Sequence, residues 1–512
     1  MKNPPRLIDG SRSSKILGWT LVLAMGHVGA ATLSVAPSGA DSGNCTTGAC
    51  ATVGYALGQA ADGDIIQLAA GTYVEQLTVD KSVTIAGVNP DRSTDLTVIQ
   101  APATLATNVD VPGYAASQQT AIVFVTDSGT DATIRNLTIR GHQSATGSYI
   151  GWGVFAGNSA KLTLDTVHVT AIRDQPLSGS QHGRAIGFGI DGSISLGNLS
   201  GSQTATGAVT DSLIDDFQKN GIEVGYAGTN VTLRGNTVTG IVTDKIAQNG
   251  IVIADGAYAL VDRNTISGMQ CNQSLCEGGG GNAWSIGLTL IDPADGTQIT
   301  HNTISGADGG VVVLDYGPAA PTITMTSNTL SDARYANLQV WGPMTLNMVG
   351  NTLSGSVDGI QAYVFRNSPV VNLNGGNTVT GASGTGIVVY GATVQGSKNR
   401  FFGNGTGAVN VASRGGTANL TCNWWGSFTG PEQTSTNPGG LGNAVSDDVS
   451  YVNWAVDAQF NHGCVGNPEW VRKNPKGPLP TPVPVDAPWA LASVALVLAG
   501  LAGRRLRRRR GR

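Results

Sequence analysis

The stretch DRNTISG at residues 262–268 returns almost unchanged as THNTISG at residues 300–306. Variants of the same phrase occur four more times, as RGNTVTG (234–240), TSNTLSD (326–332), VGNTLSG (349–355) and GGNTVTG (375–381). Successive copies begin between 23 and 38 residues apart. A phrase that returns at such intervals indicates a repeat architecture, in which each unit buries its apolar face only against its neighbours.

A second phrase recurs between the copies of the first. Its copies are NGIEVGY (220–226), NGIVIAD (249–255), SIGLTLID (285–292), GGVVVLD (309–315), DGIQAYV (358–364) and TGIVVYG (385–391). Short β-branched runs bounded by Gly, Asn or Asp are typical of strands that end in turns. Two or three such strands in roughly 26 residues, without a helix, predict an all-β right-handed parallel β-helix with coils about 4.8 Å apart. Leucine-rich repeats and propeller blades do not fit this period or composition.

The asparagine of the first phrase is interpreted as a structural residue rather than a catalytic one. Asn tolerates the left-handed backbone conformation, and its amide can hydrogen-bond to the equivalent residue of the next coil. The Val, Ile or Leu two positions later is expected to point into the core. The sequence therefore predicts a stack of asparagines at one corner of the solenoid, formed by residues 236, 264, 302, 328, 351 and 377.

Composition and charge limit the classes of ligand that the protein is expected to bind. Among 512 residues there are 72 glycines, only 6% aromatics and 12% charged residues, which suits many turns and short strands. The formal net charge of −4 conceals basic ends, with an arginine cluster over 504–512, so the stretch between them is strongly acidic. Such a body is not expected to bind nucleic acid, and would hold a polyanionic sugar only through a bridging cation.

The six cysteines favour three disulfides formed in an oxidising compartment. Metal binding is the weaker alternative, because no histidine lies at zinc-ligand spacing from them. The expected pairs are two short loops and one long closure, namely Cys45 with Cys50, Cys271 with Cys276 and Cys422 with Cys464.

Both ends of the chain have the character of targeting segments. Residues 1–31 have the basic, apolar and small-residue regions of a secretory signal peptide. A Pro-rich linker (469–488) leads to a C-terminal segment (489–512) in which 15 apolar residues precede the arginines. As a helix those 15 residues would span roughly 22 Å, short of the roughly 30 Å hydrocarbon core. A short permanent tail anchor, with its arginines in the cytoplasm, is one interpretation.

The other interpretation is a temporary stop that a protease removes. The order VPVDAPW (483–489), apolar run and arginine cluster resembles the IPTL-type and PEP-type C-terminal sorting tags of Gram-negative bacteria, with VPVD in place of IPTL. This resemblance implies export, display at the cell surface or release outside the cell, transient anchoring in the inner membrane, and a sorting protease as partner.

Residues 49–87 resemble the first coils of pectin-lyase-like β-helices, in which a short helix (here 51–61) covers the open end. Such a cap is needed because bare strand edges promote aggregation. CNWWGSFTGP (422–431) and NAVSDDVSYVNWAV (443–456) resemble the closing coils of bacterial β-helix repeat proteins. The β-helix is thus expected over 32–468. This superfold hosts lyases, hydrolases, esterases, epimerases and non-catalytic surface proteins, so it does not fix an activity.

Known pectin chemistry is not favoured. AGTYVE (70–75) matches the G-x-Y-x-E start of pectin methylesterases, but the catalytic signatures that follow it in that family have no counterpart here. Those of polygalacturonases and pectate lyases are also missing. GTYVE is therefore interpreted as a structural stretch at which a strand begins.

Taking the position five residues after the Gly that opens each strand, or after Ala336 where Ala opens it, predicts a column of side chains. Its members are Tyr226, Asp255, Asp292, Asp315 and Trp341. Carboxylates about 5 Å apart must share protons or hold a cation such as Ca²⁺, and a pair at that distance is within reach of glycosidase acid/base chemistry. The flanking aromatics could stack on sugar rings. Alternatively, each Asp simply ends a strand by bonding its own backbone.

Two insertions bear on this choice. CNQSLCEGGGGNAW (271–284) precedes the strand that ends in Asp292, and insertions in solenoids often cluster on the binding face. The other insertion, 174–192, contains His182 and Arg184. Either residue could serve as the base of a lyase, but the simpler interpretation is that both are solvated in a Gly-rich loop.

Three hypotheses follow. The first is an exported, surface-displayed β-helix that binds polysaccharide without catalysis. The second is a polysaccharide lyase or glycoside hydrolase that uses Asp255, Asp292 and Asp315. The third is a purely structural matrix protein.

Overall fold

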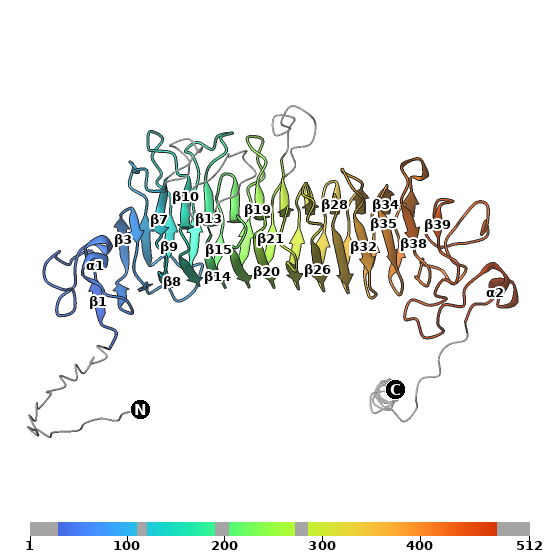
Figure 1. Cartoon of the computed structure of the whole chain (residues 1–512), viewed down its shortest axis with the longest axis horizontal. Helices are drawn as coiled ribbons and strands as arrows, with labels where there is room; N and C mark the ends of the chain where they lie inside the picture. Colours follow the sequence, from blue (N-terminus) through green and yellow to red (C-terminus); the bar gives the residue numbers. More distant parts are fainter. Residues whose placement is uncertain (1–28, 110–119, 190–203, 272–284, 479–512) are drawn as a thin grey trace, which may run out of the picture.

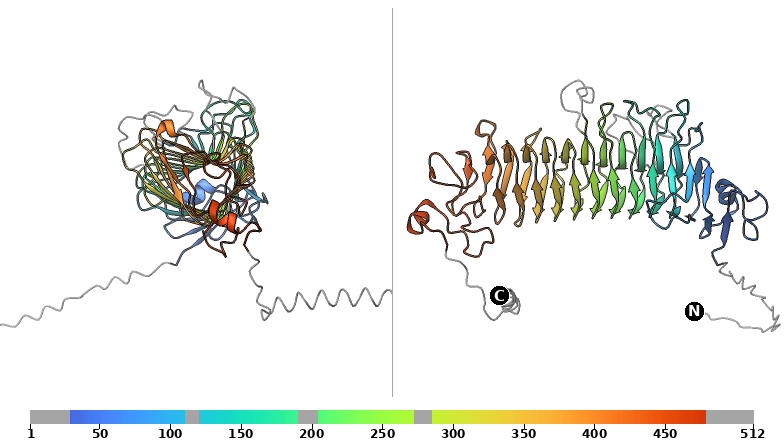
Figure 2. Two further views of the ribbon diagram at one scale, coloured as in Figure 1. Left: turned by 90° about the vertical axis from the view of Figure 1, so that its right-hand side faces the viewer. Right: turned by 180° about the vertical axis from the view of Figure 1, so that it is seen from behind.

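The computed structural model describes residues 29–109, 120–189, 204–271 and 285–478. These residues form an elongated right-handed parallel β-helix, capped by short irregular segments at both ends (Figures 1 and 2). Every strand-to-strand pairing within its three sheets, called A, B and C below, is parallel, and each strand pairs with the equivalent strand of the coils before and after it. The predicted fold class is confirmed.

Sheet A has 15 strands in the described residues. They are β1 (Thr32–Val35), β2 (Ile65–Leu68), β5 (Thr84–Ala86), β8 (Asp131–Arg135), β11 (Lys161–Asp165), β14 (Thr206–Thr210), β17 (Asn230–Arg234), β20 (Tyr258–Asp262), β23 (Gln298–Thr300), β26 (Thr322–Thr326), β29 (Thr345–Val349), β32 (Val370–Leu373), β35 (Thr393–Gly396), β38 (Thr417–Asn419) and β39 (Val449–Ser450).

Sheet B has 12 strands in the same part of the chain. They are β3 (Gly71–Val74), β6 (Thr97–Gln100), β9 (Thr138–Arg140), β12 (His168–Thr170), β15 (Leu213–Ile214), β18 (Thr237–Thr239), β21 (Thr265–Ser267), β24 (Thr303–Ser305), β27 (Thr329–Ser331), β30 (Thr352–Ser354), β33 (Thr378–Thr380) and β36 (Arg400–Phe402).

Sheet C, also 12-stranded where the structure describes the chain, is built from the second repeated phrase. Its strands are β4 (Leu77–Val79), β7 (Ala121–Val125), β10 (Trp152–Ala156), β13 (Arg184–Phe188), β16 (Asn220–Val224), β19 (Asn249–Ala254), β22 (Ile286–Ile291), β25 (Gly309–Leu314), β28 (Ala336–Trp341), β31 (Asp358–Tyr363), β34 (Thr385–Tyr390) and β37 (Thr406–Asn410).

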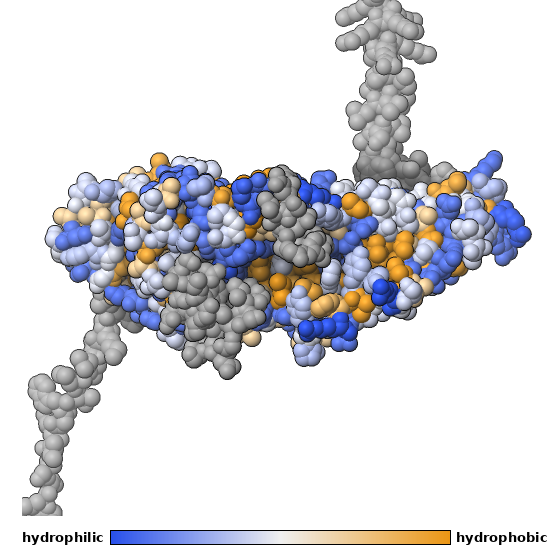
Figure 3. Space-filling view, turned by 90° about the horizontal axis from the view of Figure 1, so that it is seen from above, coloured by the Kyte–Doolittle hydropathy of each residue, from blue (hydrophilic) through white to orange (hydrophobic). Residues whose placement is uncertain are grey.

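The outer faces of the sheets differ. Strands of sheet A alternate between buried and accessible residues, as in β8 and β17, because one side faces the core and the other faces water. In sheet C, β7, β10, β13 and β16 are buried at every residue, so their outward side chains are shielded from water as well. In β31 and β34 the outward residues are half-buried. Seen from above, apolar surface gathers in the middle and right-hand part of the molecule among hydrophilic residues (Figure 3).

The predicted asparagine stack is present and extends further than predicted. Asn264 donates from its backbone N–H and its side-chain Nδ2 to Oδ1 of Asn302, at 2.9 and 3.0 Å, and its Nδ2 also donates to the carbonyl of Leu233 at 2.8 Å. The same bonds repeat through the six predicted residues and continue into Asn399 and Asn423. We call this buried row the asparagine ladder.

The predicted backbone conformation of these asparagines was wrong. The left-handed residue is the one before each asparagine, such as Arg263 and His301, each with φ of 55°. This residue lies at the outer corner, whereas the asparagine points inward and uses its side chain to bond the next coil.

The N-terminal end is capped as expected, with small differences in length. The predicted helix over 51–61 is α1 (Val53–Gln59), and it packs Val53, Ala56 and Leu57 into the core. Its first N–H groups donate to the Glu75 carboxylate, those of Val53 and Gly54 both at 2.8 Å. A carboxylate at this position satisfies otherwise unpaired donors. GTYVE is thus structural, because its first four residues form β3 and its glutamate caps α1.

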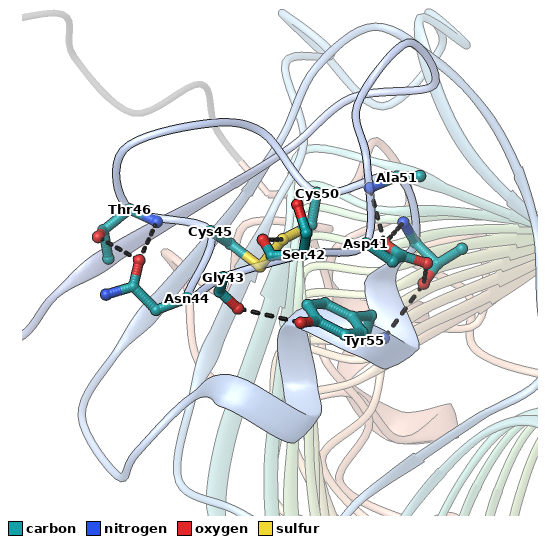
Figure 4. Close-up of a disulfide and its surroundings, with 10 residues drawn as sticks. Asp41, Ser42, Gly43, Asn44, Cys45, Thr46, Cys50, Ala51 and Tyr55 are labelled. Carbon is teal, nitrogen blue, oxygen red and sulfur yellow. Dashed lines mark hydrogen bonds between the residues drawn. A yellow bond between two sulfur atoms is a disulfide. The ribbon is translucent and has the colours of Figure 1, made fainter.

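Two of the three predicted disulfides lie within the described residues and are formed. Cys45–Cys50 fastens the loop beside α1, where Asp41 accepts from the N–H groups of Ala51 and Thr52 and the Tyr55 hydroxyl donates to Gly43 (Figure 4). Cys422–Cys464 closes the C-terminal end, ahead of α2 (Pro468–Lys473). Cys276 lies outside the described residues, so its pairing with Cys271 remains a prediction.

The described residues contain no helix long and apolar enough to cross a membrane. Most of the predicted signal peptide (1–31), and the predicted apolar segment and arginine cluster (489–512), lie outside the described residues. Those predictions, including the transmembrane and sorting interpretations of the C-terminus, therefore stand as predictions.

Candidate functional site

Three aromatic side chains form a row on the outer face of sheet C. Trp341, Tyr363 and Tyr390 close β28, β31 and β34, and they are paired in register. Neighbouring ring centroids lie 5.5 and 5.4 Å apart, and all three residues are half-buried. Ile291 and Leu314 occupy the same register position in the two preceding coils. We call Trp341, Tyr363 and Tyr390 the aromatic row.

Two amides lie beside the aromatic row, two residues before Trp341 and two residues before Tyr363. The equivalent residue of β34 is Val388. Gln339 donates to Oε1 of Gln361 at 2.6 Å, and Gln361 donates to Oδ2 of Asp358 at 2.7 Å. The Gln339 Oε1 atom is buried and has no partner among the described residues. Flat apolar faces and hydrogen-bonding groups thus lie side by side on one strip of sheet C.

Loop residues continue the aromatic character at the edge of this strip. Directly after β31, Phe365 meets Tyr316 edge-to-face with centroids 5.3 Å apart. Arg366 donates to the carbonyl of Tyr316 at 2.7 Å, and its guanidinium lies 5.6 Å from the Tyr316 ring. At the C-terminal end, the Arg414 guanidinium lies 4.8 Å from the Tyr390 ring. These contacts hold ring planes in fixed orientations.

The three aspartates of the predicted column lie in register. Ala254, Ile291 and Leu314 pair in turn, which places Asp255, Asp292 and Asp315 at equivalent positions of consecutive coils. Tyr226 occupies the same position one coil earlier, as the pairing of β16 with β19 requires.

Trp341 does not belong to this column. Gly309 pairs with Ala336 and Leu314 pairs with Trp341, so Gly342 stands next to Asp315. The prediction aligned Ala336 with the strand-opening glycine of other coils, but Asn337 holds that position. The one-residue slip moves Trp341 out of the carboxylate column and into the aromatic row.

The geometry of the aspartates is that of turn residues. Asp255 and Asp292 have φ of 52° and 46°, the left-handed conformation that Asp tolerates. Oδ1 of Asp292 accepts from the N–H groups of Tyr316 and Gly317, at 2.5 and 3.1 Å, and Oδ1 of Asp315 accepts from Gly317 at 2.8 Å. These bonds fix the loop that follows β25.

Asp292 and Asp315 nevertheless form an unusual pair. Asp315 is almost completely buried, with 1% of its surface exposed, and its Oδ2 has no partner among the described residues other than the neighbouring carboxyl. Burial, together with a hydrogen bond to Asp292, raises the pKa of Asp315 from 3.8 to about 6. The described residues contain no group of three His, Cys, Asp or Glu side chains placed to hold a metal ion. The predicted Ca²⁺ at this column therefore rests on the Asp292–Asp315 pair alone.

This pair predicts a specific dependence of stability on pH. A carboxyl whose pKa is raised in the folded state remains protonated to higher pH than in the unfolded chain. The contribution of Asp315 to folding stability therefore falls as pH rises from about 4 to about 6. Asp315→Asn keeps an acceptor for Gly317 and is expected to remove this decline, raising the free energy of unfolding at pH 8 by on the order of 1–2 kcal/mol. Urea unfolding of both proteins at several pH values measures this difference in the free energy of unfolding.

The control for that experiment is Asp332→Asn, which changes a turn aspartate outside the pair. It should leave the slope between pH 4 and pH 6 as it is in the unmodified protein. If Asp315→Asn had the same slope as the unmodified protein, the pair would not share a proton.

A second polar cluster lies on sheet C, toward the N-terminus. Nε of Arg184 donates to Oε2 of Glu223 at 2.8 Å, Asn220 donates to the same oxygen at 2.5 Å, and Asn249 donates to Asn220 at 2.9 Å. The side chain of Trp152 stacks against Arg184, whose guanidinium lies 4.9 Å from the indole ring. We call Arg184, Asn220, Glu223 and Asn249 the Arg184 network.

The expectation that His182 and Arg184 are solvated was wrong. Each exposes only 3% of its surface, and His182 bonds Asp174 at 2.7 Å. Nearby, burial and the positive charge of Arg184 outweigh the attraction of Glu223 and lower the pKa of Lys219 to about 8. Sequence reasoning did not single out Glu223, although it is a charged residue inside a copy of the second phrase at an outward strand position.

The comparisons with known proteins concern the fold. A family model described as a right-handed beta helix region matches residues 198–353 and 249–424. No curated protein matches the sequence.

Several solved structures are similar in fold. The A-module of a mannuronan C-5 epimerase from Azotobacter vinelandii is 13% identical over 65% of this chain and 86% of its own, with a TM-score of 0.41. A periplasmic alginate epimerase is 13% identical over 76% of this chain and 77% of its own, with a TM-score of 0.40. The pectin methylesterase from Aspergillus niger is 16% identical over 59% of this chain and 85% of its own, with a TM-score of 0.33. The three parallel sheets of the described residues, and not these matches, identify the protein as a right-handed parallel β-helix.

Proposed function

We propose that this protein binds a polysaccharide along the outer face of sheet C without cleaving it. The observation that carries the proposal is the aromatic row lying beside the half-buried, hydrogen-bonded pair of Gln361 and Asp358. Sugar rings have apolar C–H faces and a rim of hydroxyls, so they pair with flat aromatic surfaces next to hydrogen-bonding groups.

The spacing supports an extended ligand. Neighbouring rings of the aromatic row are 5.4 and 5.5 Å apart, close to the strand spacing of about 4.8 Å, so each coil offers one contact along the axis of the solenoid. Half-buried aromatics that adjoin Leu314 and Ile291 also form an apolar strip on an otherwise polar surface, a feature that marks binding sites. A linear glycan lying along the axis would contact several coils at once.

Export and surface display are part of the same proposal. Two disulfides in the described residues favour an oxidising compartment. The C-terminal tag would then serve a sorting protease after transient anchoring in the inner membrane, and the ligand would be a surface polysaccharide or an extracellular matrix.

A second candidate function is a polysaccharide lyase or glycoside hydrolase. It is favoured by one observation, the Asp292–Asp315 pair, because a carboxyl that stays protonated to about pH 6 can act as a general acid. Against it, Asp315 is buried and both carboxylates already bond the backbone of one loop. Binding is therefore the better supported function.

The test is to incubate the purified full-length protein with a panel of glycans, with and without Ca²⁺. Binding is followed by tryptophan fluorescence and calorimetry, and cleavage by new unsaturated or reducing ends. Binding without new ends supports the proposal. Cleavage that is lost in Asp255→Ala or Asp292→Ala would establish the enzyme instead, and no binding to any glycan would leave a structural matrix protein.

The aromatic row gives a sharper prediction. Tyr363→Ala is expected to weaken binding of the glycan that the panel identifies by about 5–30-fold, equivalent to about 1–2 kcal/mol for one stacked ring. Tyr363→Phe, which keeps the ring, should retain most of the affinity. The matched control is Phe402→Ala, which removes an exposed ring from the outer face of sheet B and should leave binding unchanged. Equal losses in both alanine variants would contradict the assignment to sheet C.

A further inference from the structure

A polar groove lies at the C-terminal end of sheet A, away from the aromatic row. It has a volume of about 740 Å³, and its floor is formed by β38 and by Gln395 of β35. A second hollow of about 310 Å³ shares Gln395, Asn419 and Thr421 with it and extends it toward Asn372. The two together form a continuous depression along the axis of the solenoid.

The floor of this groove continues a line of outward amides. Asn347, Asn372, Gln395 and Asn419 are paired in register across four consecutive strands of sheet A. Asn372 donates to Asn347 and Gln395 donates to Asn372, each at 2.9 Å. Gln395 and Asn419 are exposed, and no side-chain hydrogen bond between described residues uses Oε1 of Gln395 or the Asn419 amide. Both groups are thus available to a ligand.

Asn410 adds a buried acceptor at the wall. Its side chain donates to the carbonyl of Asp448 at 3.1 Å, and its N–H donates to Oγ of Ser446 at 2.9 Å. The residue exposes only 7% of its surface, and its Oδ1 has no partner among the described residues. A buried acceptor without a donor is unfavourable, so a hydroxyl group that reached this wall would gain a strong partner.

The lining selects the chemistry of the ligand. Apart from small apolar residues, the groove presents amides and hydroxyls, and the residues that line it include no Arg, Lys or His. Its one ionisable side chain is Asp448. A uronate or a sulfated sugar would find no positive partner there and would be repelled by Asp448, whereas uncharged hydroxyls suit amides that both donate and accept.

We infer that this groove is a binding site for a neutral, hydroxyl-rich oligosaccharide, separate from the site proposed on sheet C. It would give the molecule glycan contacts on two different faces. The inference does not depend on the proposed function of sheet C, because the two sites share no residue.

The test uses full-length protein and defined neutral probes, hexasaccharides of glucose with α-1,4 or β-1,4 linkage and of β-1,4-linked mannose, with an oligo-uronate of equal length for comparison. Affinity is measured by calorimetry and by saturation-transfer NMR. At least one neutral hexasaccharide is expected to bind, and to bind at least 10-fold more tightly than the oligo-uronate. The double variant Gln395→Ala/Asn419→Ala should weaken that binding at least 10-fold.

Two control variants locate the binding in this groove. Asn347→Ala changes the same line of amides outside the groove and should bind like the unmodified protein. Phe402→Ala, on the outer face of sheet B and outside both proposed sites, should also bind like the unmodified protein. Both substituted residues of the double variant are exposed, and a thermal unfolding curve matching the unmodified protein checks its fold. The inference is overturned if no neutral hexasaccharide binds, if the oligo-uronate binds equally well, or if the double variant binds as before.

Discussion

Replacing Asn328 by alanine is expected to lower the free energy of unfolding by about 3–5 kcal/mol, because it breaks a buried hydrogen-bond network. Oδ1 of Asn328 accepts from the backbone and side chain of Asn302, at 2.9 and 3.0 Å. Its Nδ2 donates to the carbonyl of Ile299 at 2.8 Å and to Asn351 at 2.9 Å. Alanine would remove the acceptor of the Asn302 N–H and the side-chain donor to Ile299, in a site that is 1% exposed. Asn351 would keep the backbone N–H of residue 328 and lose only the side-chain donor.

Urea unfolding followed by circular dichroism measures this loss, with Asn372→Ala as the matched control. Asn372 also belongs to a line of stacked amides, but it points outward and is half-buried, so water can replace its partners. The control is expected to cost less than about 1 kcal/mol. If both variants lost the same stability, burial of the asparagine ladder would not be the source of its contribution.

The asparagine ladder was predictable because its residues carry two signals at once. A polar residue that recurs at a fixed place in an apolar phrase is expected to hydrogen-bond to its own copies in neighbouring coils. The number of copies then gives the number of stacked residues. Asn399 and Asn423 were missed because their phrases, KNRFFG and CNWWGS, have lost the threonine that follows asparagine elsewhere. Their hydrogen bonds between coils identify them, and these bonds cannot be seen in the sequence alone.

The candidate site was harder to predict, because it depends on register and on contacts between distant segments. Trp341 was assigned to the aspartate column since Ala336 resembles a strand-opening glycine, and a slip of one residue in a strand changes which neighbours a side chain meets. His182 and Arg184 lie in a Gly-rich stretch, which led to the prediction that both side chains are exposed to solvent. Arg184 is buried against a partner outside that stretch, Glu223, which lies 39 residues away in the sequence. His182 bonds Asp174 within the stretch and contacts the Tyr149 ring outside it.

Removing the Cys422–Cys464 bridge, by replacing both residues with serine, is the second large effect we expect. The bridge closes 42 residues, and in the chain-entropy model a loop of that length contributes about 4 kcal/mol. Cys422 directly precedes Asn423, the last residue of the asparagine ladder, and its N–H donates to the carbonyl of Asn453 at 3.1 Å. The bridge therefore fastens the closing segment onto the final coil.

The same substitution in the Cys45–Cys50 bridge provides the comparison, because it closes a loop of only 5 residues and should cost about 2 kcal/mol. Urea unfolding without reductant measures both losses, and light scattering reports association. Because an uncovered strand edge pairs with other chains, loss of the C-terminal bridge should also promote aggregation, more than loss of the N-terminal one. If the short bridge proved the more important of the two, the stability of the C-terminal cap would come from its packing, centred on the buried Trp425 and Trp454, rather than from its covalent closure.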